Sequence, residues 1–338
     1  MGASLQILLA TYNGERYVAT QLESLLVQDF TDFEVLVSDD RSSDATLEIV
    51  QRYAEADTRI RVLDNDVRHG NARDNFFSLL KRAAAPYVAF CDQDDLWLPD
   101  KLAVEMAEMH RLEIAYGADA PLLVYSDLAV ASEDLSIIAP SLLAYSGADP
   151  HRLSLANLMS QNTAAGCSIV VNRPLYRDTM RLPANVDGVG MHDWWMMVTA
   201  AAFGHIGYVD QPTSLYRQHG DNSVGASSGS PLDIVRNLGA YASALLPNEQ
   251  QLGAIEMRVR QAGAFAEAYD GQLSERDQEL CEGLSRLLDL PPLARLRWCH
   301  NHDVRNATPI MRLGMAWEMA LYDQGRARLA HEQAERES

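Results

Sequence analysis

The stretch LQILLATYNGERYVATQLESLLVQDFTDFEVLVSDD, residues 5 to 40, decides the fold of this 338-residue chain. It begins with an apolar run at 5–10, continues with apolar residues three and four apart over 18–26, and ends with a second apolar run at 33–37. Short apolar runs indicate buried strands, and the wider spacing indicates a helix with one apolar face. The stretch therefore predicts a strand, a helix and a second strand.

The same rhythm continues along the chain. Apolar runs at 59–63, 87–91 and 122–125 predict further strands, and the apolar residues within 47–54 and 76–80 predict helices between them. Strands that alternate with helices form a mostly parallel sheet covered by helices. Ligands bind such sheets at the carboxyl ends of the strands. Polar clusters follow the predicted strands at this edge, at residues 11–13, 39–40, 64–66, 92–95 and 126–127.

The composition changes after the segment GASSGSP at residues 225–231, which is typical of a linker. Helical stretches rich in Ala, Leu, Glu, Gln and Arg follow it. We therefore expect an α/β domain over residues 1–228 and an α-helical region over residues 229–338.

Charge and cysteine content exclude several classes of protein. A net charge of -19 opposes nucleic-acid binding, because phosphate backbones require a basic face. No CxxC pair occurs among the cysteines, which disfavours a zinc site or a disulfide framework. The sequence has no signal-peptide pattern and no run of ~20 apolar residues. We expect a cytoplasmic protein that is neither secreted nor membrane-spanning.

Three carboxylates, those of Asp92, Asp94 and Asp95, crowd directly behind the strand at 87–91. Like charges at one place suggest a shared divalent cation, a shared proton or plain surface exposure. A calcium loop of the EF-hand type is a poor match, because Trp97 stands where its glycine is expected. Asp39 and Asp40 form a similar pair, which can bind a base, a sugar or a metal, or can form a polar turn.

An acid among large apolar side chains, Asp193 in the segment MHDWW, is a candidate general base, because apolar surroundings can raise the pKa of a carboxyl. The alternative is a helix N-cap. In the later segment YRQHGDN, Arg217 is a candidate phosphate clamp and His219 a candidate metal or phosphate ligand.

Taken in order, these motifs resemble a known family. The stretch quoted above, then YVAFCDQDDLWLPDKL, AAGCSIVVNR, HDWWMM and YRQHGDN, is similar to glycosyltransferases of family 2, closest to their bacterial rhamnosyltransferase-like branch, over residues 4–225. The resemblance implies the GT-A fold, a divalent metal (Mg²⁺ or Mn²⁺) and inversion at the anomeric carbon. It implies a nucleotide-diphospho-sugar donor, with dTDP-rhamnose favoured and a UDP-sugar open. The acceptor would be a saccharide or a lipid-linked glycan of a bacterial surface polysaccharide.

The resemblance also assigns roles to individual residues, to which the candidates argued above are added. Asp193 matches the catalytic base, and His192 stands before it where other branches carry Glu. The donor-binding candidates are Thr11, Tyr12, Asn13, Glu15, Asp39, Asp40, Asn75, Asp92, Gln93 and Arg217. The metal ligands are Asp92, Asp94 and His219, and the acceptor-side candidates are Asp95, Gly166, Cys167, His192, Trp194 and Trp195.

Two other functions fit parts of the pattern. A nucleotide-sugar-binding module without turnover, serving assembly or regulation, would keep the donor site but has no need of the base Asp193. A flavodoxin-like phosphoacceptor domain could use Asp39 and Asp40, but it leaves the later motifs unexplained. The arginine and tryptophan residues between 295 and 317 predict either contact with an anionic membrane surface or ordinary packing.

Overall fold

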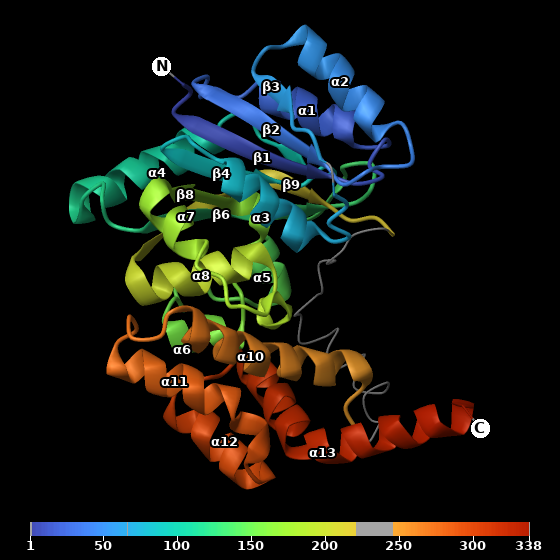
Figure 1. The fold of residues 1–338 in the computed structure, drawn as a ribbon, viewed down its shortest axis with the longest axis vertical. Coiled ribbons are helices and arrows are strands. Elements are labelled where there is room, and N and C mark those ends of the chain that lie inside the picture. The colour runs from blue at the N-terminus through green and yellow to red at the C-terminus, as the bar shows by residue number, and fades with distance from the viewer. Residues whose placement is uncertain (1, 66, 221–245, 338) are drawn as a thin grey trace. The chain divides into compact units, whose positions relative to one another are not determined.

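The computed structural model describes residues 2–65, 67–220 and 246–337, with the side chains of 335–337 left aside. Within these residues one sheet of nine strands runs in the order β3, β2, β1, β4, β8, β6, β9, β5, with β7 paired to β6. Figure 1 shows β1, β2 and β4 side by side. The strands are β1 (Leu5–Thr11), β2 (Phe33–Asp39), β3 (Ile60–Val62), β4 (Tyr87–Cys91), β5 (Leu96–Trp97), β6 (Leu122–Ala131), β7 (Ile137–Ala139), β8 (Ile169–Asn172) and β9 (His205–Arg217).

Helices cover both faces of this sheet. Successive side chains of a strand point to opposite faces, so that Leu5, Ile7 and Leu9 of β1 share one face. They form a buried cluster with side chains of the helices α1, α2 and α4, while α3, α7 and α8 pack on other strand residues. The helices of this part are α1 (Val18–Leu26), α2 (Thr46–Ala56), α3 (Ala72–Arg82), α4 (Lys101–Tyr116), α5 (Leu142–Ser146), α7 (Arg173–Thr179) and α8 (His192–Phe203), with a short 3₁₀ turn, η1 (Gly166–Ser168).

The parallel half of the sheet sets the positions of the polar strand ends. In β1 and β2 the parallel register pairs Thr11 with Asp39, and in β1 and β4 it pairs Leu9 with Cys91. The residues that follow these strands therefore emerge at one edge.

The sheet is mixed beyond β4, which differs from the mostly parallel sheet expected from the sequence. β8 runs antiparallel to both β4 and β6, and β5 runs antiparallel to β9. β6 and β9 are parallel again. The difference arises because β8 follows the short turn η1 rather than a covering helix, so its direction is set by pairing with strands far away in sequence.

The chain divides into two compact units. The first contains, of the described residues, 2–143, 164–180 and 191–220, and the second contains 144–163, 181–190 and the residues from 246 onward. The predicted boundary at 229 lies outside the described residues, so the division into 1–228 and 229–338 stays a prediction. The second unit joins two inserted segments to the C-terminal helices.

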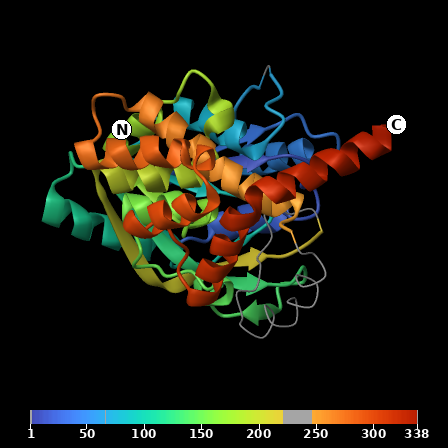
Figure 2. The same ribbon diagram turned by 90° about the horizontal axis from the view of Figure 1, so that it is seen from below.

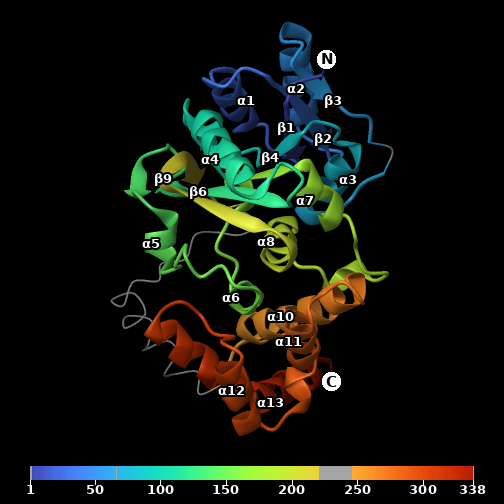
Figure 3. The ribbon, with the colours of Figure 1, turned by 90° about the vertical axis from the view of Figure 1, so that its left-hand side faces the viewer.

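The second unit is helical, as predicted for the C-terminal region. Figure 3 shows α6 beside α10, which also packs on α11 and α13, and Figure 2 shows the last helix running to the C-terminus. In the part of the chain that is described, no helix is both long and apolar enough to cross a bilayer. The helices are α6 (Leu155–Ser160), α10 (Glu249–Ala268), α11 (Glu275–Ser285), α12 (Pro292–Asn301) and α13 (Pro309–Glu337), and 3₁₀ turns occur at Val186–Gly188 and Leu287–Asp289.

The arginines of this unit mostly bind within it. Arg295 is 2% exposed and pairs with Asp323, and Arg305 pairs with Asp303. Arg312 donates to the carbonyl oxygens of Asn306 and Ala307 at 2.9 Å. Packing, the second of the two alternatives for residues 295–317, therefore accounts for these three side chains.

Candidate active site

The ends of β1 and β2 meet through a carboxylate. Oδ2 of Asp39 accepts hydrogen bonds from Oγ1 of Thr11 at 2.9 Å and from Oγ of Ser42 at 2.6 Å, and Oδ1 accepts from the backbone N–H of Ser42 at 2.8 Å. Asp39 is 5% exposed. The parallel register makes this contact, because it places Thr11 directly beside Asp39. The arrangement fixes a carboxylate at the edge where the resemblance expects the nucleobase.

Asp40 and Asn75 order the neighbouring loop. The carboxylate of Asp40 accepts from the backbone N–H groups of His69 and Gly70, and Gly70 has a φ of +78°, which favours glycine. Asn75 is buried on α3, where its amide accepts from Oγ of Ser38 and donates to the carbonyl oxygen of Ser38 at 3.0 Å. The structure thus ties Asn75 of α3 to Ser38 of β2, and its contact with a donor stays a prediction.

Tyr12 and Gln93 join β1 to the acid loop, residues 92–95. The side-chain amide of Gln93 accepts from the backbone N–H of Tyr12 at 2.8 Å and donates to its carbonyl oxygen at 2.9 Å. Gly14 leaves room for this amide, since a Cβ at that position would lie 2.3 Å from it. The Tyr12 ring is 42% exposed, and the Arg68 guanidinium lies 4.9 Å from its centroid. An exposed ring so held can stack on a base.

Asn13 and Glu15 hold the loop that leads into α2. Oδ1 of Asn13 accepts from the backbone N–H of Ser43 at 2.8 Å, and Oε2 of Glu15 accepts from that of Ala45 at 2.8 Å. Asn13 has a φ of +47°. Both predicted donor residues therefore act on the loop 42–45 in this structure.

The side chains of the acid loop contact two different parts of the chain. Asp92 and Asp95 turn toward Cys167 of η1, and ligand atoms of these three residues lie within 4.8 Å of one another. Asp94 has another partner, since its Oδ2 lies 2.9 Å from Nε2 of His219. The alternative of a solvated acidic turn does not hold for Asp95, which is 1% exposed.

Crowding changes the protonation of these acids. Burial, followed by the charges of Asp95, Asp94 and Asp193, raises the pKa of Asp92 well above its usual value. Burial and the charge of Asp94 raise the pKa of Asp95 to about 7. Carboxylates that repel one another in this way fit a divalent cation, which prefers oxygen ligands.

Arg217 and Tyr17 tie this loop to β9. The backbone N–H of Arg217 donates to Oδ1 of Asp95 at 3.1 Å, and its guanidinium donates to the carbonyl oxygens of Asp94 at 2.7 Å and Glu133 at 2.6 Å. The ring of Tyr17 lies 4.6 Å from that of His219, and its hydroxyl donates to Glu133 at 2.7 Å. Neither Tyr17 nor Glu133 was among the residues predicted from the sequence. The only sequence signal for this pair was the position of Tyr17 within the NGERY motif.

The start of α8 carries the candidate base. The helix begins at His192 with Met191 as its N-cap, so the alternative that Asp193 is the N-cap is wrong. Asp193 lies in the first turn, and its charge contributes to the raised pKa of Asp92. Trp194 follows it at an intermediate exposure, whereas Trp195 is fully buried and its indole N–H donates to the carbonyl oxygen of Thr179 at 3.1 Å. Trp195 therefore supports α8 from the core.

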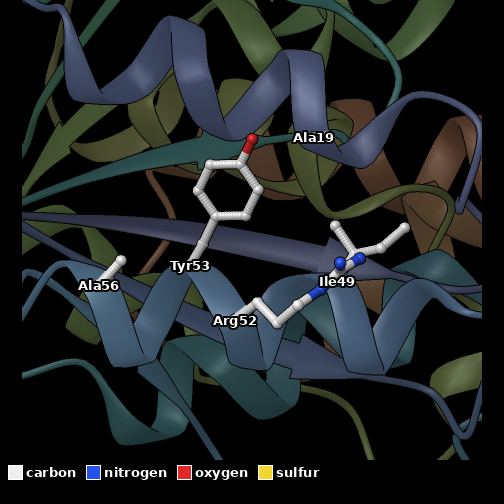
Figure 4. Close-up of a pocket in the computed structure, with 5 residues that line it drawn as sticks. All are labelled: Ala19, Ile49, Arg52, Tyr53 and Ala56. Atoms are coloured by element: carbon white, nitrogen blue, oxygen red, sulfur yellow. The ribbon is translucent and has the colours of Figure 1, made fainter.

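A separate pocket of about 370 Å³ lies between α1 and α2. Figure 4 shows that Tyr53 and Arg52 of α2 line it together with Ala19 of α1. None of the candidate site residues lines it, so it is distinct from the acid cluster.

Comparisons with known proteins concern the family and the fold. Residues 6–118 match the model of glycosyl transferase family 2. The chain is 27% identical over 243 residues to the dTDP-rhamnosyl transferase RfbG of Shigella flexneri, an alignment that covers 68% of this chain and 79% of the relative. It is 27% identical over 175 residues to the Escherichia coli UDP-Glc:alpha-D-GlcNAc-diphosphoundecaprenol beta-1,3-glucosyltransferase WfgD, covering 51% of this chain and 61% of the relative.

The fold has a solved counterpart. The structure of S. aureus TarS 1–349 in complex with UDP-GlcNAc superimposes with a TM-score of 0.54 at 17% identity, covering 98% of this chain and 92% of that one. This likeness concerns the fold, and it confirms the expected GT-A-like sheet with C-terminal helices. With the family match over the first strands and the named relatives, we identify residues 6–118 as a glycosyl transferase family 2 domain and the chain as a glycosyltransferase.

Proposed function

We propose that the chain is an inverting, metal-dependent glycosyltransferase of bacterial surface polysaccharide synthesis. It would move a sugar, with rhamnose favoured, from a nucleoside diphosphate to a hydroxyl of a glycan or lipid-linked acceptor. The observation that carries the proposal is that the acid loop and Asp193 of α8 both lie against the turn η1. Ligand atoms of Asp92 and Asp95 lie near Cys167, and Cβ of Asp193 lies 3.8 Å from a Cβ built on Gly166. Similarity to RfbG supports a dTDP-rhamnose donor, and similarity to WfgD keeps UDP-sugars open.

The donor would lie along the carboxyl edge of β1, β2 and β4. Asp39 would accept an N–H of the pyrimidine, and the exposed ring of Tyr12 would stack on the base. A divalent cation, Mg²⁺ or Mn²⁺, would be held by the acids of the loop 92–95, with Asp92 as its main ligand. When bound, the cation offsets the negative charge that grows on the departing nucleoside diphosphate.

His219 was predicted as a ligand, and its hydrogen bond to Asp94 supports a second role, that of orienting Asp94 toward the cation. Arg217 supports the loop through Asp94 and Asp95. Its predicted role as a phosphate clamp would compete with these contacts.

Asp193 would act as the base. As the acceptor oxygen forms its bond to C1 of the sugar, the bond from C1 to the diphosphate oxygen breaks on the opposite face, and the hydroxyl proton passes to the Asp193 carboxylate. Attack and departure on opposite faces invert the anomeric carbon. Holding both substrates in line supplies much of the remaining acceleration.

The competing function is a nucleotide-sugar-binding module without turnover. Such a module would need the donor-binding edge of the sheet, but it would have no need of an acid at the start of α8 beside the acid loop. Contact with a membrane surface through the C-terminal helices stays a proposal, supported by Leu313 at 72% exposed and Leu293 at 80% exposed.

The test is donor binding and turnover with a panel of dTDP- and UDP-sugars, each with and without Mg²⁺ or Mn²⁺. Asp193→Asn should keep metal-dependent donor binding and lose turnover by ~10²- to 10⁴-fold, the usual contribution of a general base. Asp94→Ala should weaken metal-dependent binding. Asp119→Asn, at an exposed position, is the matched control. Equal turnover in native protein and Asp193→Asn would refute the assignment of the base, and donor binding with no turnover in the native chain would favour the binding module.

A further inference from the structure

The imidazole of His192 fills a space between three elements of the first unit. Its ring centroid lies 4.0 Å from that of Phe76 on α3 and 5.2 Å from that of Phe90 on β4. The side chain is 2% exposed. The ring is therefore held in place by packing, and it cannot swing aside as an exposed histidine can.

Neither charge nor hydrogen bonding explains this histidine. Burial lowers its pKa to about 3, so the ring is neutral at ordinary pH. Among the described residues neither Nδ1 nor Nε2 has a hydrogen-bond partner. An unpaired buried polar atom destabilises the folded state. The role of His192 therefore lies in the shape and position of its ring rather than in its charge or its hydrogen bonds.

The ring takes the place that a side chain at residue 166 would occupy. A Cβ built on Gly166 would lie 2.8 Å from Nε2 of His192 and 3.8 Å from Cβ of Asp193. Contacts under 3 Å force a shift, and the packing of the ring against Phe76 and Phe90 opposes its movement. Gly166 begins η1, whose next residue, Cys167, lies against Asp92 and Asp95.

We propose that His192 and Gly166 are a pair of positioning residues that together set where the carboxylate of Asp193 stands relative to the acid loop. The ring fixes the first turn of α8 against η1, and the missing side chain at 166 lets the two elements approach. This inference rests on the proposed function, in which Asp193 is the base.

A double-mutant cycle tests the pair. Gly166→Ala should push the ring and displace the first turn of α8, lowering kcat by up to about 100-fold, the loss that a 1 Å misplacement can cause, with donor KM kept. His192→Ala should lower kcat by removing the support. In the double variant the methyl group added at position 166 enters the space that the truncated ring leaves, so Gly166→Ala should cause no further loss of kcat. Additive losses would overturn the proposal.

Two controls sharpen the cycle. Gly253→Ala in α10 adds a Cβ that meets no atom within 4 Å, so it should leave kcat unchanged. His192→Phe keeps a ring and removes both nitrogens, and it should retain more activity than His192→Ala. If His192→Phe were folded yet as inactive as His192→Ala, the nitrogens would be needed for the reaction, and a purely steric pair would be excluded.

Thermal unfolding separates this proposal from the proposed function. The steric coupling predicts that Gly166→Ala lowers the unfolding temperature more in the native chain than in the His192→Ala variant. This prediction does not depend on whether Asp193 is the base. If Asp193→Asn kept full turnover while this coupling was found, the base assignment would fail and the steric pair would stand without its catalytic meaning. If Asp193→Asn lost turnover and the coupling were absent, only the pair would fail.

Discussion

Nε2 of His219 lies 2.9 Å from Oδ2 of Asp94. This contact joins the segment after β9, where His219 lies, to the acid loop that follows β4. The ring of Tyr17 packs on this histidine at 4.6 Å. Parts of the chain that are 125 residues apart thus meet at one carboxylate. The contact gives Asp94 a different partner from Asp92 and Asp95, whose ligand atoms lie near Cys167.

His219→Ala should therefore weaken metal-dependent donor binding. Loss of a residue that orients a metal ligand lowers metal affinity by about 10- to 100-fold. Calorimetric titration of dTDP at fixed Mn²⁺, and of Mn²⁺ at fixed dTDP, measures the effect. His300→Ala, at an exposed position of α12, controls for removal of a histidine. Unchanged affinity for both ligands would exclude any role of His219 at the cation.

Asp39→Asn should weaken binding of pyrimidine nucleoside diphosphates. The substitution replaces a charged acceptor by a neutral amide, and a hydrogen bond to a charged group contributes about 1.5–3 kcal/mol, or roughly 10- to 100-fold in affinity. Titrations with dTDP, UDP and ADP measure it, with Asp119→Asn as the control. The loss should be larger for the two pyrimidines than for ADP. An equal loss for all three would mean that Asp39 only supports the loop at Ser42.

The buried ion pair of α4 makes a prediction about stability. Nζ of Lys101 lies 2.6 Å from Oε1 of Glu105, both side chains are at most 1% exposed, and Ser126 and Thr213 complete the network. Lys101→Met leaves a buried acid without its counter-ion and should lower the free energy of unfolding by about 3–5 kcal/mol. Denaturant unfolding of this variant, of Glu105→Leu and of the double variant measures the coupling. The double variant should recover most of the loss, and a further loss there would contradict the argument.

Local patterns predicted the parts of the fold that depend on nearby residues. The runs at 5–10 and 33–37 became β1 and β2, and the helical spacing between them became α1. Because these strands are parallel and in register, their polar ends meet, so the closeness of Thr11 and Asp39 followed from the sequence. The strand at 87–91 delivered the acids to the same edge.

Long-range pairing and side-chain direction could not be predicted in this way. The antiparallel placement of β8 depends on β4 and β6, which lie far away in sequence. No periodicity shows that Asp95 turns inward while Asp94 turns to His219, since both follow the same strand. Likewise, residues 144–163 and 181–190 carry no signal that they belong with the C-terminal helices.

His192 should make the stability of the protein depend on pH in a defined window. In the unfolded chain a histidine has a pKa near 6.5, whereas burial holds the pKa of His192 at about 3 in the folded protein. Between these values the unfolded state binds more protons, so stability falls as pH drops, by about 1.4 kcal/mol for each pH unit below 6.5. Above pH 6.5 the group is neutral in both states and contributes no slope.

His192→Phe removes the group that takes up the proton and keeps a ring of similar shape between Phe76 and Phe90. The variant should be as stable as the native chain at pH 7.5, or more stable, because it also removes two unpaired buried nitrogens. Its free energy of unfolding should fall less steeply than that of the native chain from pH 6.5 to 4.5. Denaturant unfolding at several pH values measures both slopes, with His300→Phe as the control. Parallel slopes for the native chain and His192→Phe would mean that His192 takes up a proton in the folded protein, and that its ring reaches water or a partner.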